Sequence, residues 1–175
     1  TIKSGAFKSR LQTMPAEDFP TLPEPEGVSC SFEGKAFRQL IDRTSYAMTQ
    51  QDTRYFLNGA LLTLSGAVAS MAATDGRRLA LASMPREGAD MKAIVPAKTL
   101  GVLAAGAGDI EMTVGERHLF FASGDRLLVS RTIDSEFPKY ECIIPKGNDK
   151  VVTIDRGLFA AALRLGNVYS VSGAY

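Results

Sequence analysis

One short pattern occurs twice in this sequence, more than one hundred residues apart. SGAFKSRLQTMPAEDFPTL begins at Ser4, and SGDRLLVSRTIDSEFPKY begins at Ser123. The two serines are 119 residues apart, and Phe19 and Phe137 are 118 residues apart. A repeat of this length restricts the fold more than any local motif does, because each copy has to form the same structural unit.

A second match at nearly the same offset joins the middle of the chain to its end. VVTIDRGLFAAALRLGNVYS resembles SCSFEGKAFRQLIDRTSYA, and three positions align at an offset of 122 residues: Phe32 with Ile154, Phe37 with Phe159, and Ile41 with Leu163. The alternative is chance similarity among amphipathic strands and helices. We expect the end of one copy, one whole copy and the start of a third. Thr1-Ile2-Lys3 reads as the middle of a strand, so we also expect an excised piece of a longer protein.

A proline-rich connector indicates where the copies meet. AEDFPTLPEPEG contains Pro20, Pro23 and Pro25, which make a stiff linker. The predicted domains are residues 1–26 (the C-terminal end of the first domain and the linker), 27–148 (the complete middle domain) and 149–175 (the N-terminal start of the third).

Composition and cysteine usage favour a cytoplasmic location and exclude a membrane protein. The chain is 45% hydrophobic and 22% charged, which is typical of a folded soluble protein. No apolar run approaches the roughly 18 residues that a membrane span needs. Cys30 and Cys142 lie 112 residues apart without ligand-like spacing, which fits reduced cysteines in a cytosolic protein.

The apolar spacing predicts an α+β fold. Phe37, Leu40 and Ile41 predict an amphipathic helix after a short strand, and PAKTLGVLAAGAG predicts a second, short helix. Three strands follow each helix, so the order strand, helix, three strands occurs twice. Asp75-Gly76 indicates a two-residue hairpin, whereas Asn58-Gly59 fits either a hairpin turn or a bulge. We therefore expect duplicated strand-helix-three-strand units, with two helices on one face of antiparallel sheets.

Charge is distributed unevenly between the predicted helices and the rest. The windows 34–46, 96–108 and 156–170 contain six basic residues and one acid, a net charge of +5 in a chain of net +1. Counting Glu33 and Asp155, which lie one residue outside, lowers this to +3. Cationic helices backed by sheets suit a ring whose helices face a polyanion. Ordinary solvated helix faces are the alternative.

No pattern indicates catalysis, a metal or a cofactor. Gly106-Ala107-Gly108 follows a predicted helix, so it reads as a cap and turn and not as a dinucleotide loop. His118 has no nucleophile or metal-ligand spacing around it, and Glu17-Asp18 lies in the linker. We expect a protein that is not an enzyme and has no cofactor.

Five segments together resemble one known family. QQDTRYFLNG, MAATDGRRLALASMP, IVPAK, SEFPKY and SRLQTMPAEDFPTL are similar to the bacterial DNA polymerase III beta subunit, the sliding clamp and processivity factor of DNA replication. The resemblance runs along essentially the whole chain. It implies the DNA-clamp fold, three similar domains per chain, and a homodimer ring around double-stranded DNA without sequence preference. It also implies that the replicative polymerase, the clamp loader and repair polymerases bind through short linear motifs.

The residues assigned to DNA come partly from charge and partly from this resemblance. Lys35, Arg38, Arg43 and Lys98 are the helical cations, each with a solvated surface residue as the alternative. The resemblance adds Gln51 and Tyr55 from a loop that reaches DNA in the family. For Tyr55 and the neighbouring Phe56, core packing is the alternative.

The resemblance also implies a peptide-binding cleft between the middle and third domains. Its matching positions are Arg54, Leu57, Thr74, Gly76, Arg77, Arg78, Leu79, Pro138, Cys142 and Ile143. Leu57, Leu79, Pro138 and Ile143 would form an apolar pocket, with Thr74 and Arg78 at its rim. Because Phe19-Pro20 repeats Phe137-Pro138, we interpret the Phe-Pro pair itself as structural. The alternative function is a repeat-built adaptor that binds proteins without encircling DNA.

Overall fold

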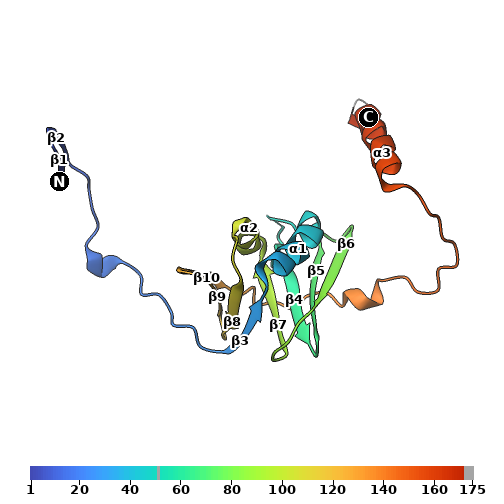
Figure 1. Ribbon diagram of the computed structural model, residues 1–175, viewed down its shortest axis with the longest axis horizontal. Helices are drawn as coiled ribbons and strands as arrows, with labels where there is room; N and C mark the ends of the chain where they lie inside the picture. The colour runs from blue at the N-terminus through green and yellow to red at the C-terminus, as the bar shows by residue number, and fades with distance from the viewer. Residues whose placement is uncertain (51, 172–175) are drawn as a thin grey trace. The chain divides into compact units, whose positions relative to one another are not determined.

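The computed structural model describes residues 1–50 and 52–171. They form two compact units, Thr1–Pro138 and Lys139–Tyr175. The first unit begins with a small hairpin of β1 (Ile2–Ser4) and β2 (Phe7–Ser9), followed by a single 3-10 turn at Ala16–Asp18. The second unit contains a 3-10 turn at Tyr140–Cys142 and helix α3 (Arg156–Val171). Figure 1 labels β1, β2 and α3 along the chain.

The main body of the first unit consists of two halves with the same order of elements. The first half runs β3 (Val28–Phe32), α1 (Gly34–Thr44), β4 (Gly59–Ser65), β5 (Val68–Thr74) and β6 (Leu79–Pro85). The second runs β7 (Met91–Pro96), α2 (Ala97–Ala105), β8 (Ile110–Val114), β9 (His118–Ser123) and β10 (Arg126–Arg131). The predicted strand-helix-three-strand duplication and the α+β class are confirmed.

The two halves exchange their first strands. One antiparallel sheet has the order β10-β9-β8-β3 and the other β6-β5-β4-β7. Strand β3 therefore pairs with β8 of the second half, with Cys30 opposite Met112, and β7 pairs with β4 of the first half, with Ala60 opposite Val95. Each sheet is completed by a strand from the other half, so the halves form one cooperative body.

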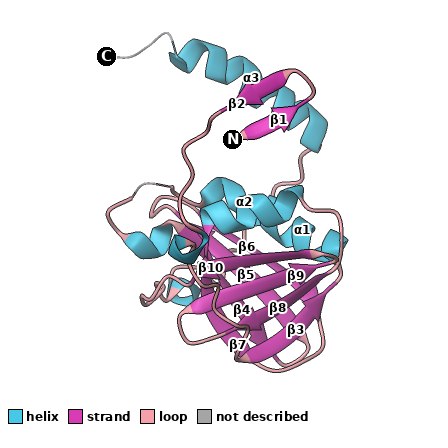
Figure 2. Cartoon of the chain, turned by 90° about the vertical axis from the view of Figure 1, so that its left-hand side faces the viewer, coloured by secondary structure: helices cyan, strands magenta, loops and turns pink. Residues whose placement is uncertain are grey.

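Helices α1 and α2 cover the same side of the sheets (Figure 2). The amide of Gly34 at the start of α1 donates to Asp109 Oδ1 at 2.9 Å, just beyond the end of α2. The guanidinium of Arg38 donates to the carbonyl of Gly106, which ends α2. The two helices thus lie side by side, with the start of α1 at the end of α2.

The core lies between these helices and the inner faces of both sheets. Its largest fully buried side chains in this cluster come from both helices and five of the strands: Phe37, Leu40, Leu62, Leu64, Met71, Val95, Leu100, Met112, Leu119 and Phe121. Burying each such side chain contributes about 1.5–3 kcal/mol relative to leaving it in water. This rigid core fixes the loops at its edges.

The repeat found in the sequence is visible in local geometry. Ser4 pairs with Phe7 across a turn that starts at Gly5, and Ser123 pairs with Arg126 across a turn that starts at Gly124. The φ angles of the two glycines are 57° and 59°, a left-handed conformation that glycine adopts without strain. Helix α3 begins 122 residues after α1, which is the offset found in the sequence.

Three local expectations differ from the structure. Strands β5 and β6 are joined by four residues, 75–78, and not by a two-residue turn, because the side chain of Asp75 organises a longer loop. Asn58 and Gly59 form neither a hairpin turn nor a bulge, since Gly59 is the first residue of β4. Residues 151–155, which the offset of 122 residues aligns with residues 29–33 at the end of β3, form no strand.

The two Phe-Pro pairs differ in their surroundings. Phe137 is only 5% exposed, and the segment before it is tied to β7 by a hydrogen bond of 3.2 Å from the Ile133 amide to the Ile94 carbonyl. Phe19 is 74% exposed. The burial of Phe137 supports a structural role for that pair.

Across the described ranges, no helix combines the length and apolar character that a bilayer crossing requires.

Candidate functional site

The helical surface carries exposed cations from both helices. Lys35 lies in the first turn of α1, Arg43 in its last turn, and Lys98 in the first turn of α2, and all three side chains are exposed. Because α1 and α2 lie side by side over the sheets, these charges belong to one helical layer (Figure 2). The expected placement of two helices on one face of the sheets is confirmed, and the assignment of these three cations to DNA remains a prediction.

Arg38 has a different environment from the other helical cations. Its side chain is half-buried, its guanidinium is bound to the Gly106 carbonyl, and its Nε atom is buried without a partner among the described residues. A cation at the carboxyl end of a helix is also favoured by the helix dipole. Arg38 therefore links α1 to α2, and its predicted contact with DNA remains a prediction.

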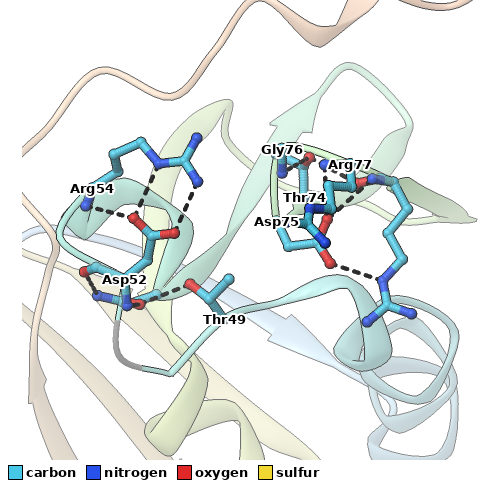
Figure 3. Close-up of polar contacts among 9 residues, drawn as sticks. Thr49, Asp52, Arg54, Thr74, Asp75, Gly76 and Arg77 are labelled. Atoms are coloured by element: carbon cyan, nitrogen blue, oxygen red, sulfur yellow. Dashed lines mark hydrogen bonds and ion pairs between the residues drawn. The ribbon is translucent and has the colours of Figure 1, made fainter. Parts of the chain in front are cut away.

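A loop before β4 is organised by one amide side chain, Asn58. Its Oδ1 accepts hydrogen bonds from Thr49 Oγ1 at 2.8 Å and from the Asp52 amide at 2.9 Å. Its Nδ2 donates to the Asp52 carbonyl at 2.8 Å (Figure 3). The sequence indicated a hairpin turn or a bulge at Asn58-Gly59 and not this role, because an Asn-Gly pair does not show which backbone groups the amide will bind.

The same loop holds Arg54 through a two-pronged ion pair. Arg54 Nε and Nη2 donate to the two carboxylate oxygens of Asp52 at 3.0 and 2.8 Å, and the Arg54 amide donates to Asp52 Oδ1 at 2.8 Å. These hydrogen bonds lower the pKa of Asp52 to about 2, and the bonds between the two side chains have the largest effect. The ion pair fixes the orientation of Arg54. Its side chain remains 53% exposed, so the edge of the guanidinium that does not face Asp52 stays accessible.

The loop between β5 and β6 is equally well ordered. Thr74 Oγ1 donates to the Arg78 carbonyl at 2.7 Å and accepts from the Gly76 amide at 3.0 Å. Asp75 Oδ1 accepts from the amides of Arg77 and Arg78 at 2.9 and 3.0 Å, and these bonds lower its pKa. Arg78 Nε donates to Asp75 Oδ2 at 2.9 Å, and the Arg78 guanidinium lies 5.7 Å from the centre of the Tyr46 ring.

The two loops meet at Gly76. A Cβ atom added to Gly76 would lie 3.0 Å from Arg54 Nη1, and the φ angle of Gly76 is 84°. Any side chain at this position would therefore displace the Arg54 guanidinium and strain the backbone. The structure thus brings five predicted peptide-binding residues to one place: Arg54, Thr74, Gly76, Arg77 and Arg78.

The other predicted peptide-binding residues are distributed differently. Leu57 is buried at 1% exposure, while Leu79 at the start of β6 and Pro138 are half-buried. Cys142 and Ile143 belong to the second unit and are exposed, Ile143 at 70%. The apolar pocket inferred from these residues remains a prediction.

Two predicted DNA-binding residues line a common cavity. A cavity of about 610 Å³ is bordered by Tyr55, which is 75% exposed, and Lys98, with Pro96 and Ile133 among its apolar walls. Gln51 lies outside the described residues.

Within the ranges that are described, no cluster of three or more His, Cys, Asp or Glu side chains is placed to hold a metal ion.

The chain is similar to a group of replication proteins. The family model for the DNA polymerase III beta subunit, central domain, matches residues 31–139. The beta sliding clamp of Pseudomonas putida KT2440 is 42% identical over 163 residues, which are 89% of this chain and 44% of the relative. The beta sliding clamp of Escherichia coli K12 is 33% identical over 156 residues, which are 85% of this chain and 43% of the relative.

Solved structures show the same similarity. The sliding clamp of Pseudomonas aeruginosa bound to griselimycin has a TM-score of 0.70 and 38% identity, covering 78% of this chain and 39% of the clamp. The beta subunit from Thermotoga maritima has a TM-score of 0.72 at 24% identity, covering 82% of this chain and 41% of that structure, and supports the fold alone. The chain spans less than half the length of the curated relatives described above.

Proposed function

The chain belongs to the DNA polymerase III beta subunit family, and we propose that it forms part of a cytoplasmic sliding clamp. In this proposal two copies of the whole protein close into a ring around double-stranded DNA, and the ring tethers the replicative polymerase. Residues 1–26, 27–148 and 149–175 contribute to three successive clamp domains. The protein catalyses no reaction itself and acts by holding its partners on DNA.

The arrangement of the helices is the observation that carries this proposal. Sheets back a layer of two adjacent helices, and Lys35, Arg43 and Lys98 extend from that layer into solvent. Helices that lie on DNA without entering a groove make few phosphate contacts, and phosphate contacts carry no sequence information. A clamp has to slide, so sparse and sequence-independent cations suit it. Arg38, Gln51 and Tyr55 complete the proposed DNA-facing set.

A loading experiment tests the ring. The full-length protein that contains this chain is loaded onto nicked circular DNA by a clamp loader. The fraction of protein retained on the DNA is measured before and after the DNA is linearised. We expect retention on circles and rapid loss from linear DNA. Retention that is the same on both substrates, or no retention on circles, would favour the adaptor that binds only proteins.

Charge variants test the helical layer separately. We expect the triple variant Lys35→Gln, Arg43→Gln, Lys98→Gln to bind circular DNA with a weaker salt dependence, because each lost phosphate contact reduces the slope of log K against log salt by about 0.9. The matched control, Lys92→Gln, Arg117→Gln, Arg126→Gln, removes three exposed cations outside the helices. Equal salt slopes for the two triple variants would contradict the assignment of the helices to DNA.

The second component of the proposal is capture of short peptides. The ordered loops around Gly76 supply polar rim groups, and the half-buried Leu79 and Pro138 supply apolar surface. The proposed set also includes Leu57, which is 1% exposed, and Cys142 and Ile143, which belong to the second unit. The sliding clamp of Pseudomonas aeruginosa, a similar protein, has been solved with griselimycin bound, which supports a ligand site on a clamp of this family. Partners would include the replicative polymerase, the clamp loader and repair polymerases.

Peptide titration tests this component. A labelled peptide with a glutamine and a terminal hydrophobic pair is titrated by fluorescence anisotropy against the protein. We expect Leu79→Ala to weaken binding about tenfold or more, because a few apolar anchors carry most of such binding energy. Leu127→Ala, at a half-exposed leucine of β10, is the control. Equal losses in the two variants would contradict the assigned pocket.

A further inference from the structure

Three arginines form a basic rim around Gly76, defined here as Arg54, Arg77 and Arg78. Two of them already have a carboxylate partner. Arg54 is paired in two-pronged geometry with Asp52 at 2.8 Å, and Arg78 is paired with Asp75 at 2.9 Å. Arg78 is further held against the ring of Tyr46. Their charges are therefore largely balanced before any partner arrives.

Arg77 differs from the other two rim residues. Its side chain is exposed, and within residues 1–50 and 52–171 no hydrogen bond or ion pair engages its guanidinium. Its backbone is nevertheless fixed, because its amide donates to Asp75 Oδ1 at 2.9 Å. Arg77 thus combines a fixed backbone with a charged side chain that is free to bind a partner.

Asp75 is poorly placed to balance Arg77 in addition to Arg78. Its Oδ1 accepts two backbone amides and its Oδ2 accepts Arg78 Nε, so both oxygens are already in use. The rim and its two carboxylates together carry a net charge of +1, and the unbalanced charge is located on Arg77.

We propose that Arg77 makes this site selective for partner peptides that carry an acidic residue next to the apolar motif. The proposal rests on the proposed capture of peptides at this site. An aspartate or glutamate beside the motif would receive the free guanidinium of Arg77, while Arg54 and Arg78 stay bound to their own carboxylates. Peptides with a basic residue at the same place would be disfavoured.

The expected effect is modest because the pair stays exposed to solvent. Exposed ion pairs contribute little and are screened by salt, so we expect an acidic peptide to bind about two- to fivefold more tightly than its neutral counterpart. Charges at the rim of an interface act mainly on the association rate, so most of the gain should appear in the rate constant of association.

The experiment compares three peptides that share one motif and differ only in a flanking glutamate, glutamine or lysine. Each is titrated against the unaltered protein, Arg77→Gln and Arg77→Glu at low salt and at about 0.5 M salt. Arg117→Gln, which removes an exposed cation from the turn between β8 and β9, is the matched control. The backbone bond of residue 77 to Asp75 is retained in both variants, so the loop should keep its structure.

The outcomes separate this inference from the function on which it rests. We expect the preference for glutamate to disappear in Arg77→Gln, to reverse in Arg77→Glu and to persist in Arg117→Gln. If all three peptides bind equally to the unaltered protein, or if the preference survives in Arg77→Gln, the inference is wrong and peptide capture still stands. If no peptide binds at all, both fail.

Discussion

A buried arginine provides a sharp test of the energetic reasoning. The side chain of Arg86, just after β6, is 1% exposed, whereas its carboxylate partner Asp90 is 68% exposed. Arg86 Nη2 donates to Asp90 Oδ1 at 3.2 Å and Nη1 donates to the Ala89 carbonyl at 2.7 Å. Asp90 Oδ1 also accepts the amide of Gly66 at 2.8 Å, so one carboxylate joins two loops.

We predict that Asp90→Ala lowers the free energy of unfolding by about 2–4 kcal/mol. Loss of the Gly66 hydrogen bond accounts for about 1 kcal/mol. The rest arises because the buried Arg86 charge loses its counter-ion while its Nε already lacks a partner among the described residues. By contrast, Arg86→Met should change stability by less than about 1 kcal/mol, because the charge itself is removed and Ala89 and Asp90 remain exposed to water.

Urea unfolding followed by circular dichroism measures the free energy of unfolding of both variants, and equal m-values would show that both unfold over the same exposed surface. In the Arg86→Met background, Asp90→Ala should cost only about 1 kcal/mol, the contribution of the Gly66 hydrogen bond. Asp90→Asn keeps an acceptor for Gly66 and removes the charge, so it isolates the counter-ion effect. Additive effects in the double variant, or a loss above about 3 kcal/mol for Arg86→Met, would refute the reasoning.

Two further predictions concern titratable groups. Arg54 holds the pKa of Asp52 at about 2, below its ordinary value of 3.8, so the ion pair should contribute stability above about pH 4 and lose that contribution as the pH falls towards 2. The stability difference between the protein and Asp52→Asn, followed by urea unfolding from pH 7 to pH 2, should be constant down to pH 5 and then shrink; a difference that grows on acidification would contradict the pairing. Burial raises the pKa of the Cys30 thiol to about 11, so iodoacetamide at pH 8 should modify the exposed Cys142 quickly and Cys30 only after unfolding, as mass spectrometry of labelled peptides would show. Equal labelling rates in the folded protein would be inconsistent with the burial of Cys30.

Regular features of the fold followed directly from local patterns in the sequence. The spacing of Phe37, Leu40 and Ile41 predicted the buried face of α1, and all three side chains are at most 2% exposed. The Ser-Gly pairs at residues 4 and 123 mark equivalent turns in the structure. These features depend on residues close together in the chain, which is why periodicity and turn chemistry detect them.

Features that depend on distant residues could not be predicted in this way. Nothing in the residues near Arg38 shows that its guanidinium will bind the carbonyl of Gly106, 68 residues later. The same holds for the contact between Arg54 and Gly76, and for the strand exchange between the halves. The distribution of charge along the sequence indicated cationic helices, but it could not separate the exposed Lys35 from the half-buried Arg38.

The exchange of first strands between the halves also constrains how the chain is made. Cys30 of β3 meets Met112 of β8, so the ribosome must synthesise about eighty more residues before β3 finds its neighbour. Until then both edges of β3 are unpaired, whereas in the folded sheet β3 is the outermost strand and pairs with β8 along one edge; unpaired edges of this kind attract other chains. Because pairings between distant residues form slowly, the nascent polypeptide should be most prone to aggregation in this interval, and a chaperone that shields residues 28–32 would raise the yield of folded protein.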